Sequence, residues 1–183
     1  MDDTSVKAGR LTSEYKNGFL RYIRLGNTEL VRMIYFALRD KNWNTLPLRI
    51  VAQTENFSPD AFSIEYTAEN LREEQAVVRW DVRIEGTADE KISFTFTATF
   101  LSDFIRNRAG FCLLHPLRET IGQAFLVTHP DGSTSEGHFP KQINPHQPCI
   151  DITQFSWSTD DGTKVLLAYE GDIFEMEDQR NWS

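Results

Sequence analysis

The stretch Ile92-Ser93-Phe94-Thr95-Phe96-Thr97-Ala98-Thr99-Phe100 decides the fold, because its side chains alternate between apolar and polar without a break. Successive side chains of a β-strand point to opposite faces, so a period of two predicts a half-buried strand. The segment 78–85 repeats the alternation, and 86–91 supplies a turn between the two. We therefore predict a hairpin that buries Trp80, Val82, Phe94 and Phe96 and exposes Arg79, Arg83, Thr95 and Thr97.

Similar hairpin signals recur at 19–38, 125–133 and 155–169, each with a turn-rich centre. Helix signals are sparse, and only 69–75 is predicted to form a turn or two of helix. Strands with one apolar face then have to cover that face with another sheet. The predicted fold class is all-β, an antiparallel β-sandwich or its mutarotase-like supersandwich variant, without long helices. The proline-rich stretch 138–148 is predicted to cross irregularly between strands.

The chain has 183 residues and shows no internal repeat or linker, so we predict a single domain over 1–183. Its last residues form a dense charged motif, whereas natural termini are usually poorly ordered. We therefore expect this domain to be the N-terminal domain of a longer protein. Cys112 and Cys149 are far apart and form no metal-like pair, which predicts two reduced, buried thiols and no metal site.

The composition excludes several classes of partner. A net charge of −8 opposes the counterion release on which nucleic-acid binding depends. No apolar stretch approaches the roughly 18 residues that span a bilayer, and the N-terminus lacks a leader pattern. We expect a soluble cytoplasmic protein without nucleic-acid or membrane partners. No phosphate-binding glycine loop or nucleophile elbow occurs, so no cofactor is predicted.

Candidate binding and catalytic side chains lie in loops and at strand ends, where sites usually form. His115 and His146 each neighbour a proline and are candidate acid–base groups, although a lone histidine is more often a packed residue. The other candidates are predicted to bind substrate. An indole either stacks on a sugar ring or packs against other side chains of the protein. A guanidinium either binds a carboxylate through two N–H groups or pairs with acidic side chains at the surface. These substrate-binding candidates are Trp43, Arg106, Arg108 and Trp182.

The terminal motif crowds negative charge at Glu175, Glu177 and Asp178, beside Arg180 and Asn181. Such crowding raises the pKa of at least one carboxyl group unless Arg180 neutralises it. Two interpretations stay open. The acids are candidate catalytic groups, with Arg180 and Asn181 binding substrate, or the motif is an ion-pair network that holds a domain junction.

Four segments together, 39–45, 104–116, 137–148 and Phe-Glu-Met-Glu-Asp-Gln-Arg-Asn-Trp at 174–182, resemble the N-terminal region of D-apionate lactonase-type proteins. The resemblance implies a hydrolase of sugar-acid lactones in the catabolism of apiose, with a small sugar-acid lactone or other carbohydrate as ligand. Family members continue into an α/β barrel, and catalytic groups of barrels sit on their βα loops. The implied role here is therefore structural or pocket-supporting, and the isolated domain is expected to be inactive.

Two alternatives from other classes are kept. A stand-alone sugar epimerase of the mutarotase type would use His115 or His146 with a carboxylate such as Glu175 to exchange protons with a sugar. A non-catalytic carbohydrate-binding module would need only exposed aromatic side chains.

Overall fold

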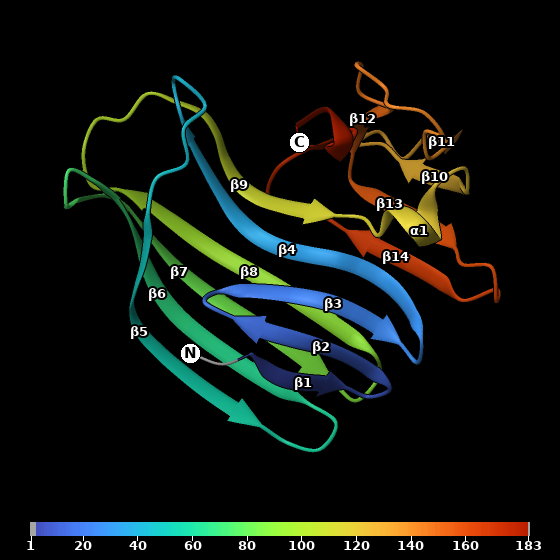
Figure 1. The fold of residues 1–183 in the computed structure, drawn as a ribbon, viewed down its shortest axis with the longest axis horizontal. Helices are drawn as coiled ribbons and strands as arrows, with labels where there is room; N and C mark the ends of the chain where they lie inside the picture. The colour runs from blue at the N-terminus through green and yellow to red at the C-terminus, as the bar shows by residue number, and fades with distance from the viewer. Residues whose placement is uncertain (1–2, 183) are drawn as a thin grey trace. The chain divides into compact units, whose positions relative to one another are not determined.

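The computed structural model describes residues 3–182, which are almost entirely antiparallel β-structure (Figure 1). The described helical segments are one turn of α1 at Leu117–Thr120 and the 3-10 helix η1 at Gln179–Trp182. None of the helices in the described part is long and apolar enough to cross a membrane. The all-β prediction is confirmed.

The chain divides into two compact units, Met1–Leu113 and Leu114–Ser183, which we describe separately. The prediction of a single domain over 1–183 stays a prediction. In the first unit, Figure 1 shows two layers of strands. One layer is a five-stranded sheet in the order β1-β2-β3-β4-β9, with β1 at Thr4–Ala8, β2 at Leu11–Lys16, β3 at Phe19–Leu25, β4 at Thr28–Asp40 and β9 at Arg106–Leu114. The other has the order β5-β6-β7-β8, with β5 at Leu48–Phe57, β6 at Phe62–Arg72, β7 at Gln75–Thr87 and β8 at Lys91–Phe100.

Aromatic rings from both sheets build the core of this sandwich. The Phe36 ring of β4 lies 4.5 Å from Trp80 of β7 and 4.7 Å from Phe111 of β9. Phe94 and Phe96 of β8 meet the same Phe111 ring edge-on, at 4.7 and 4.5 Å. Such clusters contribute beyond the apolar area they bury. They explain why the alternating strands pack face to face.

The predicted hairpin is confirmed as β7–β8, with Trp80 paired to Ala98 and Val82 to Phe96. Trp80 and Val82 are buried as predicted, and Arg79, Arg83, Thr95 and Thr97 are exposed. The prediction for Phe96 is wrong, since its side chain is 37% exposed, and Phe94 is only half-buried. β8 is the last strand of its sheet, so no further strand shelters these rings.

The helical turn predicted at 69–75 is also wrong. These residues end β6, make a turn and begin β7. Glu73 and Glu74 both adopt positive φ, 51° and 64°, which suits a tight hairpin turn. Glu73 and Glu74 are long residues that favour helices, but they form a turn because β6 and β7 pair with each other on both sides of them.

Polar side chains cover the outer face of the β5–β8 sheet in cross-strand rows. Glu69 binds Arg49 at 2.9 Å and Arg79 at 2.8 Å, and Thr67 donates to Asp81 at 2.7 Å. These rows follow from the register, because each outward residue pairs with an outward residue on the next strand.

The second unit has a four-stranded sheet in the order β11-β10-β13-β14 and a separate pair, β12 with β15. Phe125, Phe139, Phe155 and Trp157 form its aromatic core, with Phe125 and Phe155 4.8 Å apart. The predicted hairpins at 125–133 and 155–169 and the irregular crossing after His138 are confirmed. The strands are β10 at Ala124–Thr128, β11 at Thr134–His138, β12 at Cys149–Ile152, β13 at Gln154–Ser158, β14 at Lys164–Ala168 and β15 at Phe174–Met176.

Cys112 and Cys149 are half-buried thiols in different units and are not joined in a disulfide. Burial raises the pKa of the Cys149 thiol to about 12, so this sulfur stays protonated at neutral pH. It packs against the Met176 sulfur at 3.8 Å.

Candidate ligand platform and terminal clamp

In the first unit, the loop from Arg39 to Thr45 is held by the side chain of Asp40. Its Oδ1 accepts the backbone N–H groups of Asn42 at 2.8 Å and Asn44 at 2.9 Å, and its Oδ2 accepts the Asn44 amide at 3.1 Å. The Trp43 N–H donates to the Asp40 carbonyl at 3.0 Å, which closes the turn. A short aspartate side chain that bonds its own following backbone is a common loop-builder. The loop is therefore preformed.

This loop presents Trp43 to solvent, with 46% of the residue exposed. Its φ of 68° is rare for a bulky residue, and such strain persists only where neighbouring contacts fix the backbone. The Arg108 guanidinium of β9 lies 5.8 Å from the Trp43 ring, within the range of cation–π attraction. The Asn107 amide also donates to the Lys41 carbonyl at 3.1 Å, which ties β9 to the loop.

The structure thus brings together two predicted substrate-binding residues, Trp43 and Arg108, which we call the ligand platform. An indole offers an apolar surface to the C–H groups of a sugar, and a guanidinium suits a carboxylate or carbonyl oxygen. Both contacts are of the kind that hold a ligand, so the platform is a candidate binding surface. Arg106 is exposed two residues before Arg108 on the same strand.

In the second unit, Asp178 and Arg180 bind each other and the 140–144 loop, and we call this pair the terminal clamp. Asp178 is buried and accepts the backbone N–H of Asn144 at 3.0 Å. Arg180 reaches the opposite side of the same loop, where its guanidinium donates to the carbonyls of Pro140, Lys141 and Gln142 at 2.9, 3.2 and 3.0 Å. The Asn181 amide donates to the Asn144 carbonyl.

The clamp sets the charge state of Asp178. Hydrogen bonds from the Arg180 side chain lower the pKa of the Asp178 carboxyl group to about 2. An acid this strong remains ionised at neutral pH and is a poor proton donor. The contacts favour the interpretation of the terminal motif as an ion-pair network, and its catalytic role stays a prediction.

His115 lies among the core rings of the second unit. Its imidazole is 5.1 Å from Phe139 and 5.2 Å from Trp157, and its Nδ1 is inaccessible to solvent. Burial lowers the pKa of His115 to about 4, so the ring is neutral at pH 7. The Gln179 amide donates to the His115 carbonyl at 3.2 Å, so η1 is anchored beside it.

The remaining candidates lie around the clamp. His146 is exposed, and its backbone N–H donates to the Asn144 side chain at 3.0 Å. Glu175 is exposed on β15, and Glu177 is half-buried. The side chain of Trp182 lies outside the described residues, so its predicted role stays a prediction. Across residues 3–182, no group of three or more His, Cys, Asp and Glu side chains is placed to hold a metal ion.

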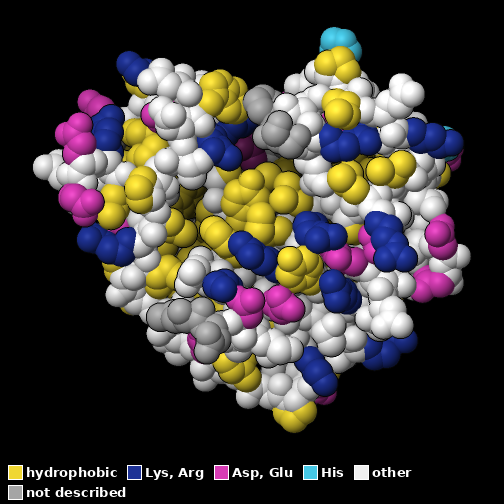
Figure 2. Space-filling view, in the orientation of Figure 1, with side chains coloured by type: hydrophobic (Ala, Val, Ile, Leu, Met, Phe, Trp, Pro, Cys, Tyr) yellow, Lys and Arg dark blue, Asp and Glu magenta, His cyan; other side chains and the backbone are white. Residues whose placement is uncertain are grey.

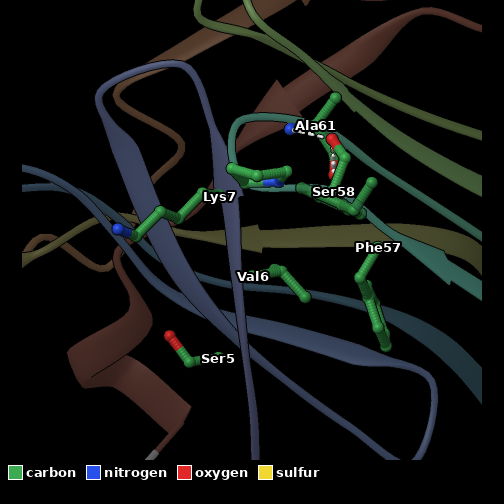
Figure 3. A pocket seen from close by; sticks show the side chains of 8 residues that line it. Ser5, Val6, Lys7, Phe57, Ser58 and Ala61 are labelled. Carbon is green, nitrogen blue, oxygen red and sulfur yellow. Dashed lines mark hydrogen bonds between the residues drawn. The ribbon is translucent and has the colours of Figure 1, made fainter.

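A pocket of about 320 Å³ lies elsewhere in the first unit, between β1 and the β5–β6 turn. Figure 3 shows Phe57, Val6 and the Ser58–Ala61 turn around it, with the Lys7 amine directed away. The Ser58 hydroxyl is already bonded to the Ala61 carbonyl and N–H, both at 3.0 Å. This pocket contains none of the predicted site residues and has no converging charged groups.

Sequence reasoning missed the residues that position the site. Asp40 and Asn144 were not candidates, although each supports one of the two clusters. The spacing of Asp40 before Asn42 and Asn44 is a signal of an aspartate-built turn. Asn144 makes a similar local contact with the His146 N–H, but its contacts with the clamp join residues far along the chain, which no local pattern marks.

Antiparallel sheets in two compact units define an all-β protein whose candidate binding groups sit in loops and at strand ends. Comparison with known proteins assigns the family. The chain belongs to the D-apionate lactonase family, whose N-terminal domain matches residues 1–183. A D-apionate lactonase from Brucella anthropi is 33% identical over 180 residues, which cover 98% of this chain and 30% of that protein. No solved structure matches the chain.

Proposed function

We propose that the chain acts as the pocket-supporting N-terminal domain of a hydrolase that opens a sugar-acid lactone. Family membership and the name of the relative support this proposal. The chain spans 30% of that relative's length, so the activity of the whole protein is itself part of the proposal.

The observation that carries the proposal is the ligand platform. A lactone of a sugar acid has a C–H face for the indole of Trp43 and a carbonyl oxygen for the guanidinium of Arg108. Because the aspartate-built loop is already formed, little conformational entropy is lost on binding. The platform would form one wall of the pocket.

Lactone hydrolysis needs a water nucleophile, donors for the developing oxyanion and an acid that protonates the leaving ring oxygen. In this chain Asp178 is held ionised and Arg180 is bonded to three backbone carbonyls. We therefore assign the acid–base groups to a barrel domain that would follow in the longer protein. The domain described here would position substrate for that barrel.

The test compares catalysis and binding in the purified 183-residue chain. Ribono-1,4-lactone is incubated with the chain, and released acid is titrated against the spontaneous rate. We expect no acceleration. Turnover above about 1 s⁻¹, within the ordinary enzyme range, would show that the chain holds a complete active site.

Binding is followed by isothermal titration calorimetry with the same lactone. We expect saturable binding whose dissociation constant rises at least fivefold in Trp43→Phe and in Arg108→Gln, whereas the matched control Arg106→Gln changes it less than twofold. Equal effects of Arg106→Gln and Arg108→Gln would refute the platform.

A stand-alone carbohydrate-binding module is the second candidate, favoured by the exposure of Trp43. It predicts tighter binding of xylopentaose than of the lactone.

A further inference from the structure

The β3–β4 hairpin of the first unit carries a basic and aromatic cluster that the ligand platform does not include. The guanidinium carbons of Arg24 and Arg32 lie 5.3 and 5.2 Å from the centre of the Tyr22 ring. Figure 2 shows Lys and Arg side chains on this face of the molecule, interspersed with Asp, Glu and hydrophobic side chains.

Tyr22 occupies an unusual backbone position. Its φ is 53°, within a stretch where the β2–β3 register shifts between Thr12 and Glu14. A bulge re-aims a side chain, and a left-handed backbone is strained for a residue as bulky as tyrosine. The bulge places the Tyr22 ring 5.3 and 5.2 Å from the guanidinium carbons of Arg24 and Arg32, which limits their rotamers before any ligand arrives.

The charges in this cluster do not balance. Glu29, with 6% of its side chain exposed, lies 2.6 Å from Arg32 Nε but 3.5 Å from Arg24 Nη2. A charge-assisted hydrogen bond is normally 2.7–2.9 Å long, so the contact with Arg24 is weak. One buried carboxylate therefore faces two guanidinium groups that are 46% and 44% exposed. The Glu69 trio of the outer sheet face has the same count of charges, so what distinguishes this cluster is the weak contact of Arg24 with Glu29.

A second trio in the same unit shows the difference. Glu69 also serves two arginines, but Arg49 and Arg79 bind separate carboxylate oxygens at 2.9 and 2.8 Å. Both guanidinium groups are thus bound to Glu69, and within residues 3–182 neither lies over an aromatic ring. This trio is a purely structural network and provides a matched control.

We propose that Arg24, Arg32 and Tyr22 form a binding site for a small carboxylate anion. The two guanidinium groups supply N–H donors in a planar arrangement that suits a carboxylate. Tyr22 acts as the positioning residue, because its ring holds both groups ready and reduces the entropy lost on binding.

The test compares two molecules with the same carbon skeleton, the anion ribonate and its uncharged lactone. The 183-residue chain is titrated calorimetrically with ribonate and with ribono-1,4-lactone at about 0.01 M ionic strength, where surface charges are little screened. We expect saturable binding of ribonate at this site, and at least tenfold weaker binding after Arg24→Gln or Tyr22→Ala. Arg49→Gln should change the affinity less than twofold, and Trp43→Phe should leave this site intact.

Three results would overturn the site: no saturable ribonate binding, equal loss with Arg49→Gln, or lactone binding that Arg24→Gln weakens as much as ribonate binding. Because Tyr22→Ala alters a strained backbone position, Tyr22→Phe is tested beside it. Tyr22→Phe keeps the ring and should retain wild-type affinity. Sulfate serves as a competitor, and sulfate binding tighter than ribonate would refute a preference for carboxylates.

Discussion

Asp178 and Arg180, two residues apart in the chain, bind each other through both carboxylate oxygens, with Nε 2.9 Å from Oδ1 and Nη2 2.7 Å from Oδ2. The two contacts make a forked pair, the geometry in which an arginine and a carboxylate interact most strongly. Only 3% of the Asp178 side chain and 19% of the Arg180 side chain are exposed. The pair therefore joins the 140–144 loop to η1 in a largely dry setting.

Removing the guanidinium should destabilise the second unit. In Arg180→Ala the carboxylate of Asp178 stays buried without its cation, which costs about 3 kcal/mol in comparable buried pairs. Urea unfolding followed by circular dichroism measures the loss. Arg118→Ala, on the exposed side of α1, is the control and should change stability by less than about 0.5 kcal/mol. Equal effects of the two variants would contradict the clamp.

Acid should destabilise the protein in two successive pH ranges. The pKa of His115 is lowered from 6.5 to about 4 by burial, so between these values the unfolded chain binds a proton that the folded chain does not. Stability therefore falls as pH drops from 6.5 to 4. The Asp178 carboxyl group, with its pKa lowered from 3.8 to about 2 by Arg180, contributes stability above pH 3.8 that is lost toward pH 2.

The variant His115→Phe separates the two ranges. It removes the titrating imidazole and keeps a ring among Phe139, Phe155 and Trp157. We expect its urea midpoint to change less than that of the wild type between pH 6.5 and 4.5. If the urea midpoint fell equally with pH in the two proteins, the burial of His115 would not be the cause of the acid destabilisation in this range.

A methyl group at position 86 should disrupt the sandwich. A Cβ built on Gly86 would lie 2.1 Å from the Phe62 ring and 2.8 Å from the Ala8 Cβ. Overpacking of this kind costs about 1–3 kcal/mol, so Gly86→Ala should lower the urea midpoint. The double variant Gly86→Ala with Phe62→Leu should lose less than the sum of the single variants, since the smaller side chain makes room.

Loosening the Arg39–Thr45 loop should expose Trp43 further. Asp40→Ala removes three hydrogen bonds to Asn42 and Asn44. We expect stronger acrylamide quenching of Trp fluorescence and a stability loss of about 1 kcal/mol. Trp43→Phe identifies the share of the signal that comes from Trp43. Asp60→Ala, in the exposed β5–β6 turn, serves as the control and should leave the quenching unchanged.

The strands could be predicted because a period of two is a local property. Trp80 and Val82 face the core in the structure, as the alternation of β7 requires. The exposure of Phe96 was not predictable in this way, because it depends on which strand lies at the edge of the sheet. Edge position is set by pairings between distant segments, which no local pattern records.

The candidate site was predicted in part for the same reason. Trp43 and Arg108 were both candidates from residue type, but their contact joins a loop to a strand more than sixty positions later. Tyr22, Arg24 and Arg32 escaped notice, since they look like ordinary residues of a surface hairpin. Their meeting depends on a bulge in the β2–β3 pairing, and neither 12–14 nor 21–24 contains a glycine or proline to mark it.

The continuous register of β7 and β8 has a consequence for how such domains diverge. Ten consecutive pairs, from Val78 with Phe100 to Thr87 with Lys91, place aromatic residues inward and polar residues outward. Inserting or deleting a single residue in either strand would turn every later side chain to the wrong face. Natural variants should therefore differ in these strands by substitution alone, and differences in chain length should collect in connections such as residues 102–105.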